Sequence, residues 1–137
     1  MNSINWPRVG ASGALWALVY NLIWGVAWFA FMRKAWQDAV TAINKPMPWT
    51  AEVWFIWVVL TVPIGVAIMA YAAGHAGSAS RAAIYASLPL WGLMTAGMAI
   101  HAWQESFSMR VIFLDSTMNL VAMVAASFAG GWSQREA

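Results

Sequence analysis

Four long apolar stretches decide what this chain can fold into. They cover residues 9–31, 51–73, 82–103 and 109–132. Each is long enough to cross a bilayer as a helix, which takes about 20 apolar residues. Lipid offers no partner to free backbone N–H and C=O groups, so such stretches form helices in which these groups bond to one another. The sequence therefore predicts an all-α integral membrane protein, a four-helix bundle that forms a single transmembrane domain over residues 1–137.

The composition supports the lipid bilayer as the main partner of the surface. Only 9% of the residues are charged, against about 25% in an average globular protein, so a soluble fold would lack its polar shell. The 11 tryptophans agree with this, because amphipathic aromatic side chains favour the membrane interface. The basic residues are scattered along the chain, which argues against a nucleic-acid partner. The absence of cysteine excludes disulfides and thiolate metal sites.

The short connections between the stretches predict antiparallel neighbours in up-down-up-down order, with both termini on one side. The basic residues on the side of the termini are Arg8, Arg81 and Arg135, and those on the other side are Arg33, Lys34, Lys45 and Arg110. The excess of four over three favours the second side as the cytoplasmic one, by the positive-inside rule.

Small and polar residues predict which helix faces pack together, because small side chains let backbones approach and polar ones bond across helices. In the first stretch one face carries Gly10, Ala14, Asn21, Gly25 and Trp28, and in the fourth one face carries Asp115, Asn119, Ala122 and Ala126. Asn21 and Asn119 lie near the middle of their stretches, so we expect a hydrogen bond between them. A contact with a ligand is the alternative role for the two amides.

Proline occurs near the middle of the second and third stretches, at Pro63 and Pro89. Each proline removes a helical hydrogen bond and frees the carbonyl four residues earlier. A simple kink is the plain interpretation, and a kink that opens a cavity is the alternative.

Asp115 is the most unusual residue in an apolar stretch, because a carboxylate inside the membrane needs a partner or water. Two interpretations are open. Asp115 could accept a salt bridge from Arg33, Lys34 or Arg110, which lie at the same end of the bundle. It could instead line a polar vestibule with His101 and Glu105 that binds a ligand or relays a proton.

The third stretch carries Met94, Met98, His101 and Glu105 on one narrow stripe. Met94, Met98 and His101 have the soft ligand atoms that a copper ion prefers, although methionine more often fills gaps in a core. No cofactor is predicted, and no hydrolase or phosphate-binding motif is present.

Two segments together resemble a bacterial family of small four-helix membrane proteins of unknown function. The first is "INWPRVGASGALWALVYNLIWGVAWFAFMRKAWQDA", and the second is "SFSMRVIFLDSTMNLVAMVAASFAGGW". The resemblance implies four helices in the bacterial cytoplasmic membrane and marks Trp36 and Asp115 as positions of interest, with no established activity. Small multidrug exporters have the same size and helix count, but they rely on a glutamate in the first helix, where this chain has Asn21.

Three functions remain open from the sequence. The first is an accessory or assembly subunit without catalysis, which would form a homo-oligomer or join other membrane subunits. The second is a binding or transport protein for a small apolar molecule or a proton, using Asp115, His101 and Glu105, with Arg33 as a further candidate. The third is a membrane-embedded acid/base enzyme on the same residues.

Overall fold

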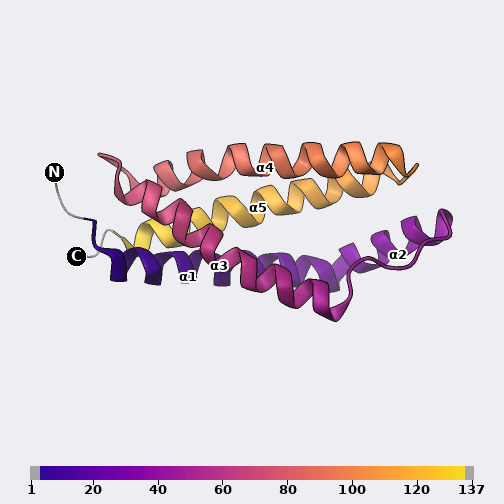
Figure 1. Cartoon of the computed structure of the whole chain (residues 1–137), viewed down its shortest axis with the longest axis horizontal. Helices are drawn as coiled ribbons and strands as arrows, with labels where there is room; N and C mark the ends of the chain where they lie inside the picture. Colours follow the sequence, from indigo (N-terminus) through magenta and orange to yellow (C-terminus); the bar gives the residue numbers. More distant parts are fainter. Residues whose placement is uncertain (1–3, 135–137) are drawn as a thin grey trace.

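The computed structural model describes residues 4–134, and that part of the chain consists of helices and their connections. The elements are α1 (Trp6–Ala27), the π-helical turn η1 (Trp28–Met32), α2 (Arg33–Ala42), α3 (Ala51–Ala73), α4 (Ala79–Gln104) and α5 (Met109–Ser133). Because α1, η1 and α2 are continuous, the fold is the predicted all-α bundle of four long apolar helices, each able to cross a membrane by length and composition. Both termini lie at one end (Figure 1). Arg135 lies outside the described residues.

The first helix is longer than the predicted 9–31, because it continues through α2 to Ala42. Its 37 residues correspond to about 55 Å of α-helix, well beyond the roughly 30 Å of a hydrocarbon core. The prediction was wrong because Arg33 and Lys34 end the apolar run without ending the helix.

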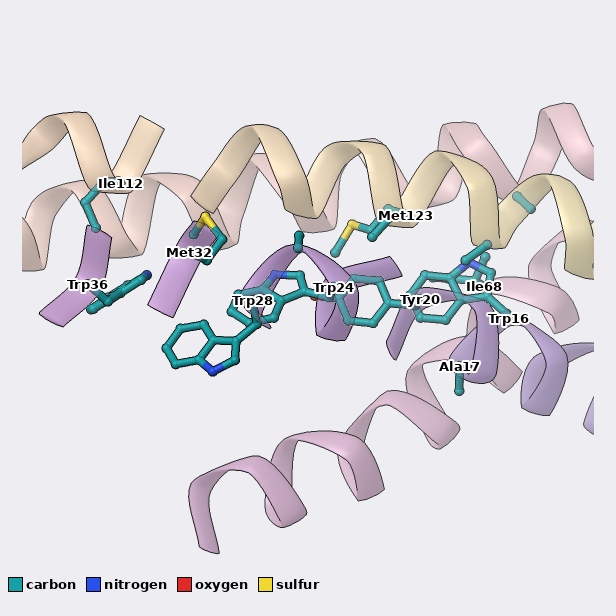
Figure 2. Close-up of a cluster of buried hydrophobic side chains, with 14 of the residues drawn as sticks. Trp16, Ala17, Tyr20, Trp24, Trp28, Met32, Trp36, Ile68, Ile112 and Met123 are labelled. Carbon is teal, nitrogen blue, oxygen red and sulfur yellow. The ribbon is translucent and has the colours of Figure 1, made fainter. Parts of the chain in front are cut away.

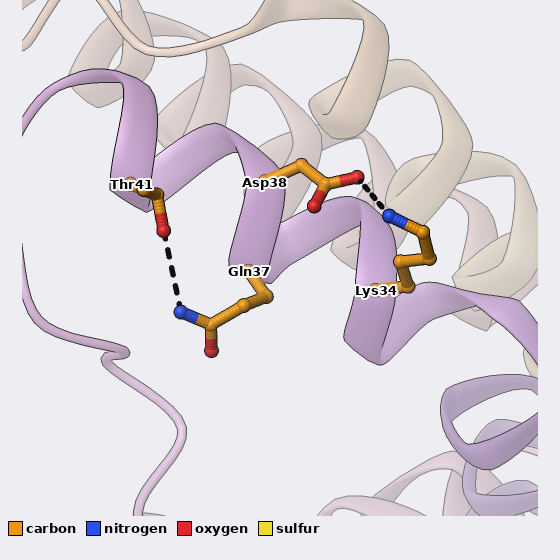
Figure 3. A network of polar contacts seen from close by, with 4 residues as sticks. All are labelled: Lys34, Gln37, Asp38 and Thr41. Carbon is orange, nitrogen blue, oxygen red and sulfur yellow. Dashed lines mark hydrogen bonds and ion pairs between the residues drawn. The ribbon is translucent and has the colours of Figure 1, made fainter.

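Helix α2 is amphipathic, which explains why it continues. Its outer face carries the ion pair of Lys34 with Asp38 (2.7 Å) and the hydrogen bond from Gln37 to Thr41 (3.3 Å), each between residues four apart (Figure 3). Its other face is buried and carries Trp36, Ala39 and Val40. The helix therefore persists through packing of one face after the chain has become polar.

A row of large side chains follows the buried face of the first helix at every fourth position (Figure 2). It consists of Trp16, Tyr20, Trp24, Trp28, Met32 and Trp36, all buried. A spacing of four exceeds the 3.6 residues of an α-helical turn, so a strict row drifts around the helix. In η1 the backbone N–H of Arg33 bonds to the carbonyl of Trp28, five residues back. This wider turn offsets the drift and returns the last members of the row to the buried face.

The end of the bundle that holds the termini, called the closed end below, is packed backbone to backbone through glycine. A Cβ on Gly65 of α3 would lie 2.4 Å from the carbonyl oxygen of Gly13 in α1, and one on Gly131 of α5 would lie 2.4 Å from the Ser80 backbone in α4. The prediction that Gly10 and Gly25 make the packing face of α1 was wrong, since nothing lies within 4 Å of a Cβ at either position.

The other predicted features of the helices can be placed as follows. Ala14, also predicted on the packing face of the first helix, is exposed, whereas the predicted face of α5, which includes Ala122 and Ala126, is buried. Pro63 and Pro89 lie inside α3 and α4 with exposed rings, so both prolines face away from the core.

Candidate ligand-binding site

A cavity of about 530 Å³ lies at the end of the bundle opposite the termini, called the open end below. Its walls come from every helix and include Trp24, Trp36, Trp49, Trp54, Met98 and Asp115. The volume falls within the range of about 300–1,000 Å³ that is typical of small-molecule sites. The lining is mostly apolar with a few polar groups, which is the composition expected of a site for a small organic molecule.

Five indoles pack against one another beside this cavity and are called the tryptophan cluster below: Trp24, Trp28, Trp36, Trp49 and Trp54. All of them except Trp28 line the cavity. Trp49 is central, because its ring centroid lies 5.7–6.0 Å from those of the other four. The rings of Trp36 and Trp49 meet edge to face at 89°. Edge-to-face contacts align the positive edge of one ring with the negative face of the next. The cluster therefore connects α1, α2 and α3 through rigid side chains.

Asp115 lies at the inner wall of the cavity and is only 1% exposed. Its Oδ2 accepts a hydrogen bond from the Trp36 indole (2.9 Å), and its Oδ1 accepts one from the Asn119 amide (2.6 Å). Asn119 in turn accepts a hydrogen bond from the Tyr20 hydroxyl. The carboxyl group thus links Asn119 to Trp36 in a hydrogen-bonded chain that joins α1, α5 and α2.

The predicted salt bridge to Asp115 was wrong. Lys34 pairs with Asp38 on the outer face of α2, and Arg33 and Arg110 are exposed. No Lys, Arg or His side chain between residues 4 and 134 forms an ion pair with Asp115. The physical reason is the rotation of the first helix, which turns the indole of Trp36 to Asp115 and leaves Arg33 and Lys34 exposed.

The predicted hydrogen bond between Asn21 and Asn119 was also wrong, although both amides do bond across helices. Asn21 donates to the Thr61 hydroxyl of α3 (2.8 Å), whereas Asn119 bonds to Tyr20 of α1. Residues 20 and 21 point to different neighbours because consecutive side chains are about 100° apart around a helix. The side chain of Tyr20, one position earlier, takes the place predicted for Asn21.

The structure brings three of the four ligand or proton candidates to one cavity. Asp115, His101 and Glu105 all line it, while Arg33 does not. Glu105 forms an ion pair with Lys45, which joins the connection before α3 to the connection after α4. Asp115, His101 and Glu105 form no hydrogen bonds to one another within the described part of the chain. They share a space without forming a single catalytic array, and their roles stay predictions.

Met94, Met98 and His101, the copper candidates, line the same cavity from α4. The described residues contain no group of three or more His, Asp or Glu side chains that could hold a metal ion. The copper hypothesis thus stays a prediction, based on three side chains of α4 that line the same wall of the cavity.

The prediction from the sequence did not include the tryptophans of the cavity wall. It assigned indoles to the membrane interface, and it did not use the spacing of four that runs from Trp16 through Trp24 to Trp36. That row, followed by Trp49, Trp54 and their neighbours, was the available signal. Trp49 has a further feature, since its indole nitrogen is buried with no hydrogen-bond partner in residues 4–134. A buried N–H without an acceptor lowers stability, so a ligand oxygen there would be favourable.

The fold and this site define a class: a small protein with four candidate membrane-spanning helices and an apolar cavity at one end of the bundle. No protein-family model matches the chain, and no curated protein or solved structure is significantly similar to it. The resemblance to the bacterial four-helix family therefore stays a prediction. The hydrogen bond between Trp36 and Asp115, the two positions that the resemblance marks, comes from the geometry alone.

Proposed function

We propose that this protein binds a small, mostly apolar molecule in the cavity at the open end, with Asp115 as the polar anchor. The observation that carries the proposal is a largely apolar cavity of about 530 Å³ with one deeply buried carboxyl group in its wall. Apolar walls supply affinity, and a few fixed polar groups supply orientation. The resemblance to a bacterial family suggests the bacterial cytoplasmic membrane as the location.

Two glycines of α4 allow a direct test. A Cβ at Gly97 or at Gly92 would meet nothing within 4 Å, so both positions have room for a larger side chain. Gly97 lines the cavity and Gly92 does not. Gly97→Phe should therefore fill the cavity, and Gly92→Phe is the matched control with the same change on the same helix.

The measurement is fluorescence quenching in phosphatidylcholine nanodiscs by a medium-chain bromoalkanol, because bromine quenches tryptophans that it contacts. Wild-type protein and Gly92→Phe should show a saturable component, and Gly97→Phe should lose it. Circular dichroism confirms that each variant is folded. Quenching that rises without saturation in the wild type, or equally in all three proteins, would refute binding in this cavity.

A second function, the assembly subunit, is favoured by the outer face of α4. Only 5 of the 26 residues of α4 are buried, against 11 of the 25 residues of α5. Leu93 and Trp103 are 74% and 81% exposed. An apolar face of this kind is covered by lipid or by another membrane helix.

The absence of cysteine allows a clean test of the second function. Leu93→Cys places one thiol on the outer face of α4, and Phe128→Cys places one on α5, where the side chain is also exposed. If α4 is a subunit interface, oxidation in membranes should give a disulfide-linked dimer much faster with Leu93→Cys. Equal rates for the two variants would count against a specific α4 interface.

A further inference from the structure

The charges of the cavity do not balance. Its ionisable side chains are Lys45, His101, Glu105 and Asp115. Lys45 and Glu105 form an ion pair and neutralise each other. Asp115 has no ion-pair partner in residues 4–134, so its carboxylate is the negative charge that the cavity leaves unbalanced. A ligand that fits this cavity by charge is therefore a cation.

The hydrogen bonds that Asp115 accepts do not compensate its negative charge, so a cation can pair with it. Its hydrogen bonds come from the neutral Trp36 and Asn119 side chains, which orient the carboxyl group without neutralising it. Each carboxylate oxygen accepts one of these hydrogen bonds and has capacity for another. A buried carboxylate is normally retained only with a paired charge, and in the described part of the chain no side chain supplies one.

The aromatic wall fits the same kind of ligand. Trp24, Trp36, Trp49 and Trp54 all line the cavity. The face of an indole attracts an ammonium group, and groups of aromatic rings are a common way to bind organic cations in proteins. Met94 and Met98 on the opposite helix offer an apolar, adaptable surface for a hydrocarbon chain.

We propose that the ligand is a lipophilic ammonium ion, with its ammonium group at Asp115 beside the indoles and its hydrocarbon tail against Met94 and Met98. This inference rests on the proposed function, because it specifies the ligand class of the same cavity. The ammonium group can belong to a free amine or to the headgroup of an ethanolamine lipid, since the chemistry recognised is the same.

The first test needs no variant. Four probes with the same brominated chain and different ends (ammonium, trimethylammonium, hydroxyl and carboxylate) are compared by saturable quenching in phosphatidylcholine nanodiscs. The primary ammonium should bind about tenfold more tightly than the alcohol, after correction for partition into nanodiscs without protein, because it adds a charged hydrogen bond and a cation–π contact. The carboxylate should bind most weakly.

Variants then assign the selectivity to one residue. Asp115→Asn keeps the shape and a hydrogen-bond acceptor for Trp36, so it should remove most of the preference for ammonium over alcohol while the alcohol still binds. Asp38→Asn is the matched control, since it removes the same charge at the same end but outside this cavity. Its selectivity should equal that of the wild type. If Asp115→Asn is unfolded by circular dichroism, the comparison of the four probes on the wild type decides alone.

The outcomes separate the two proposals. Saturable binding of the alcohol at least as tight as that of the ammonium would overturn the ammonium inference and leave the proposed function intact. Absence of saturable quenching by every probe would overturn both. Nanodiscs that contain phosphatidylethanolamine distinguish the source: competition by this lipid supports a headgroup as the natural ligand, and unchanged probe affinity supports a free amine.

Discussion

At the closed end of the bundle the helices touch through glycine and serine, whereas at the open end they are held apart by tryptophan. Gly13 and Gly65 bring α1 and α3 into backbone contact, and Gly131 does the same for α5 against Ser80 of α4. The tryptophan cluster occupies the corresponding space at the other end, next to the cavity. Both ends consist of the same helices, so the size of the side chains sets the distance between them.

Helix α3 carries this change of size in its own sequence. Going from the closed to the open end, the residues of α3 that face α1 are Gly65, Thr61, Trp57 and Trp54. Over these three turns the size of the side chain increases from none in glycine to the largest in tryptophan. A helix with such a gradient crosses its neighbour closely at one end and diverges from it at the other, which leaves space for a cavity.

The polar groups of the two ends differ in the same way. At the closed end neutral hydroxyls bond to one another, with Ser12 and Ser133 at 2.8 Å and Ser87 and Ser127 at 2.9 Å. At the open end a carboxyl group bonds to neutral donors and has no ion-pair partner among residues 4–134. At the closed end these buried hydroxyls therefore satisfy one another, whereas at the open end the carboxyl group can still accept a hydrogen bond from a ligand.

The largest expected effect tests the close packing of the closed end. Gly65→Ala places a methyl group on the Gly13 carbonyl, so the helices must separate, and we expect a loss of about 3 kcal/mol in the free energy of unfolding. Gly97→Ala, at the cavity, should be neutral or stabilising by up to about 1 kcal/mol, because alanine favours helix. Unfolding by SDS in mixed micelles, followed by circular dichroism, measures both. Equal effects would remove the distinction between the two ends.

The next effect tests the hydrogen bond that anchors the open end. Trp36→Phe removes the donor to Asp115 Oδ2 and leaves the buried carboxyl group with one fewer partner. We expect a loss about 2 kcal/mol larger than that of Trp28→Phe, a similarly buried indole that makes no hydrogen bond in the described part of the chain. The same unfolding measurement compares the two. Identical losses would mean that Trp36 acts through packing alone.

A smaller effect tests the hydroxyl pairs of the closed end. Ser127 accepts a hydrogen bond from the Trp16 indole (3.0 Å) and pairs with Ser87, so Ser127→Ala leaves the indole N–H without an acceptor and Ser87 with only its bond to the Ala83 carbonyl. The expected loss is about 1–2 kcal/mol, since hydrogen bonds between membrane helices are individually weak. Thr117→Ala, an exposed hydroxyl bonded within its own helix, should stay within about 0.5 kcal/mol. A loss equal to that of the control would show that the pairs do not stabilise the bundle.

The smallest effect concerns the ion pair at the open end. Lys45 and Glu105 are 50% and 32% exposed in their side chains, so water and salt weaken their attraction. A double-mutant cycle with Lys45→Ala and Glu105→Ala should give a coupling free energy below about 1 kcal/mol, and less at high salt. A coupling of several kcal/mol would show that the open end is held by charge more than by its indoles.

Part of the site could be predicted from the sequence because depth along a helix follows from counting residues. Asp115, His101 and Glu105 lie at the same end by their positions in the chain, and the structure places all three around one cavity. Their partners could not be predicted, because a rotation of about 100° separates Asn21 from Tyr20 and decides which one reaches Asn119. Arg33 was assigned to the site by depth alone and faces away from it.

The sequence by itself determined the number of long helices, their order and the end at which the polar residues gather, since each apolar run is long enough to form a helix that could cross a membrane. Only the tertiary structure decided how each helix is rotated, and with it that Trp36 rather than an arginine meets Asp115. Rotation depends on how side chains of unequal size fit where helices cross, as at Gly13 and Gly65. Those contacts join residues far apart in the chain, so the spacing of residues within one helix does not predict them.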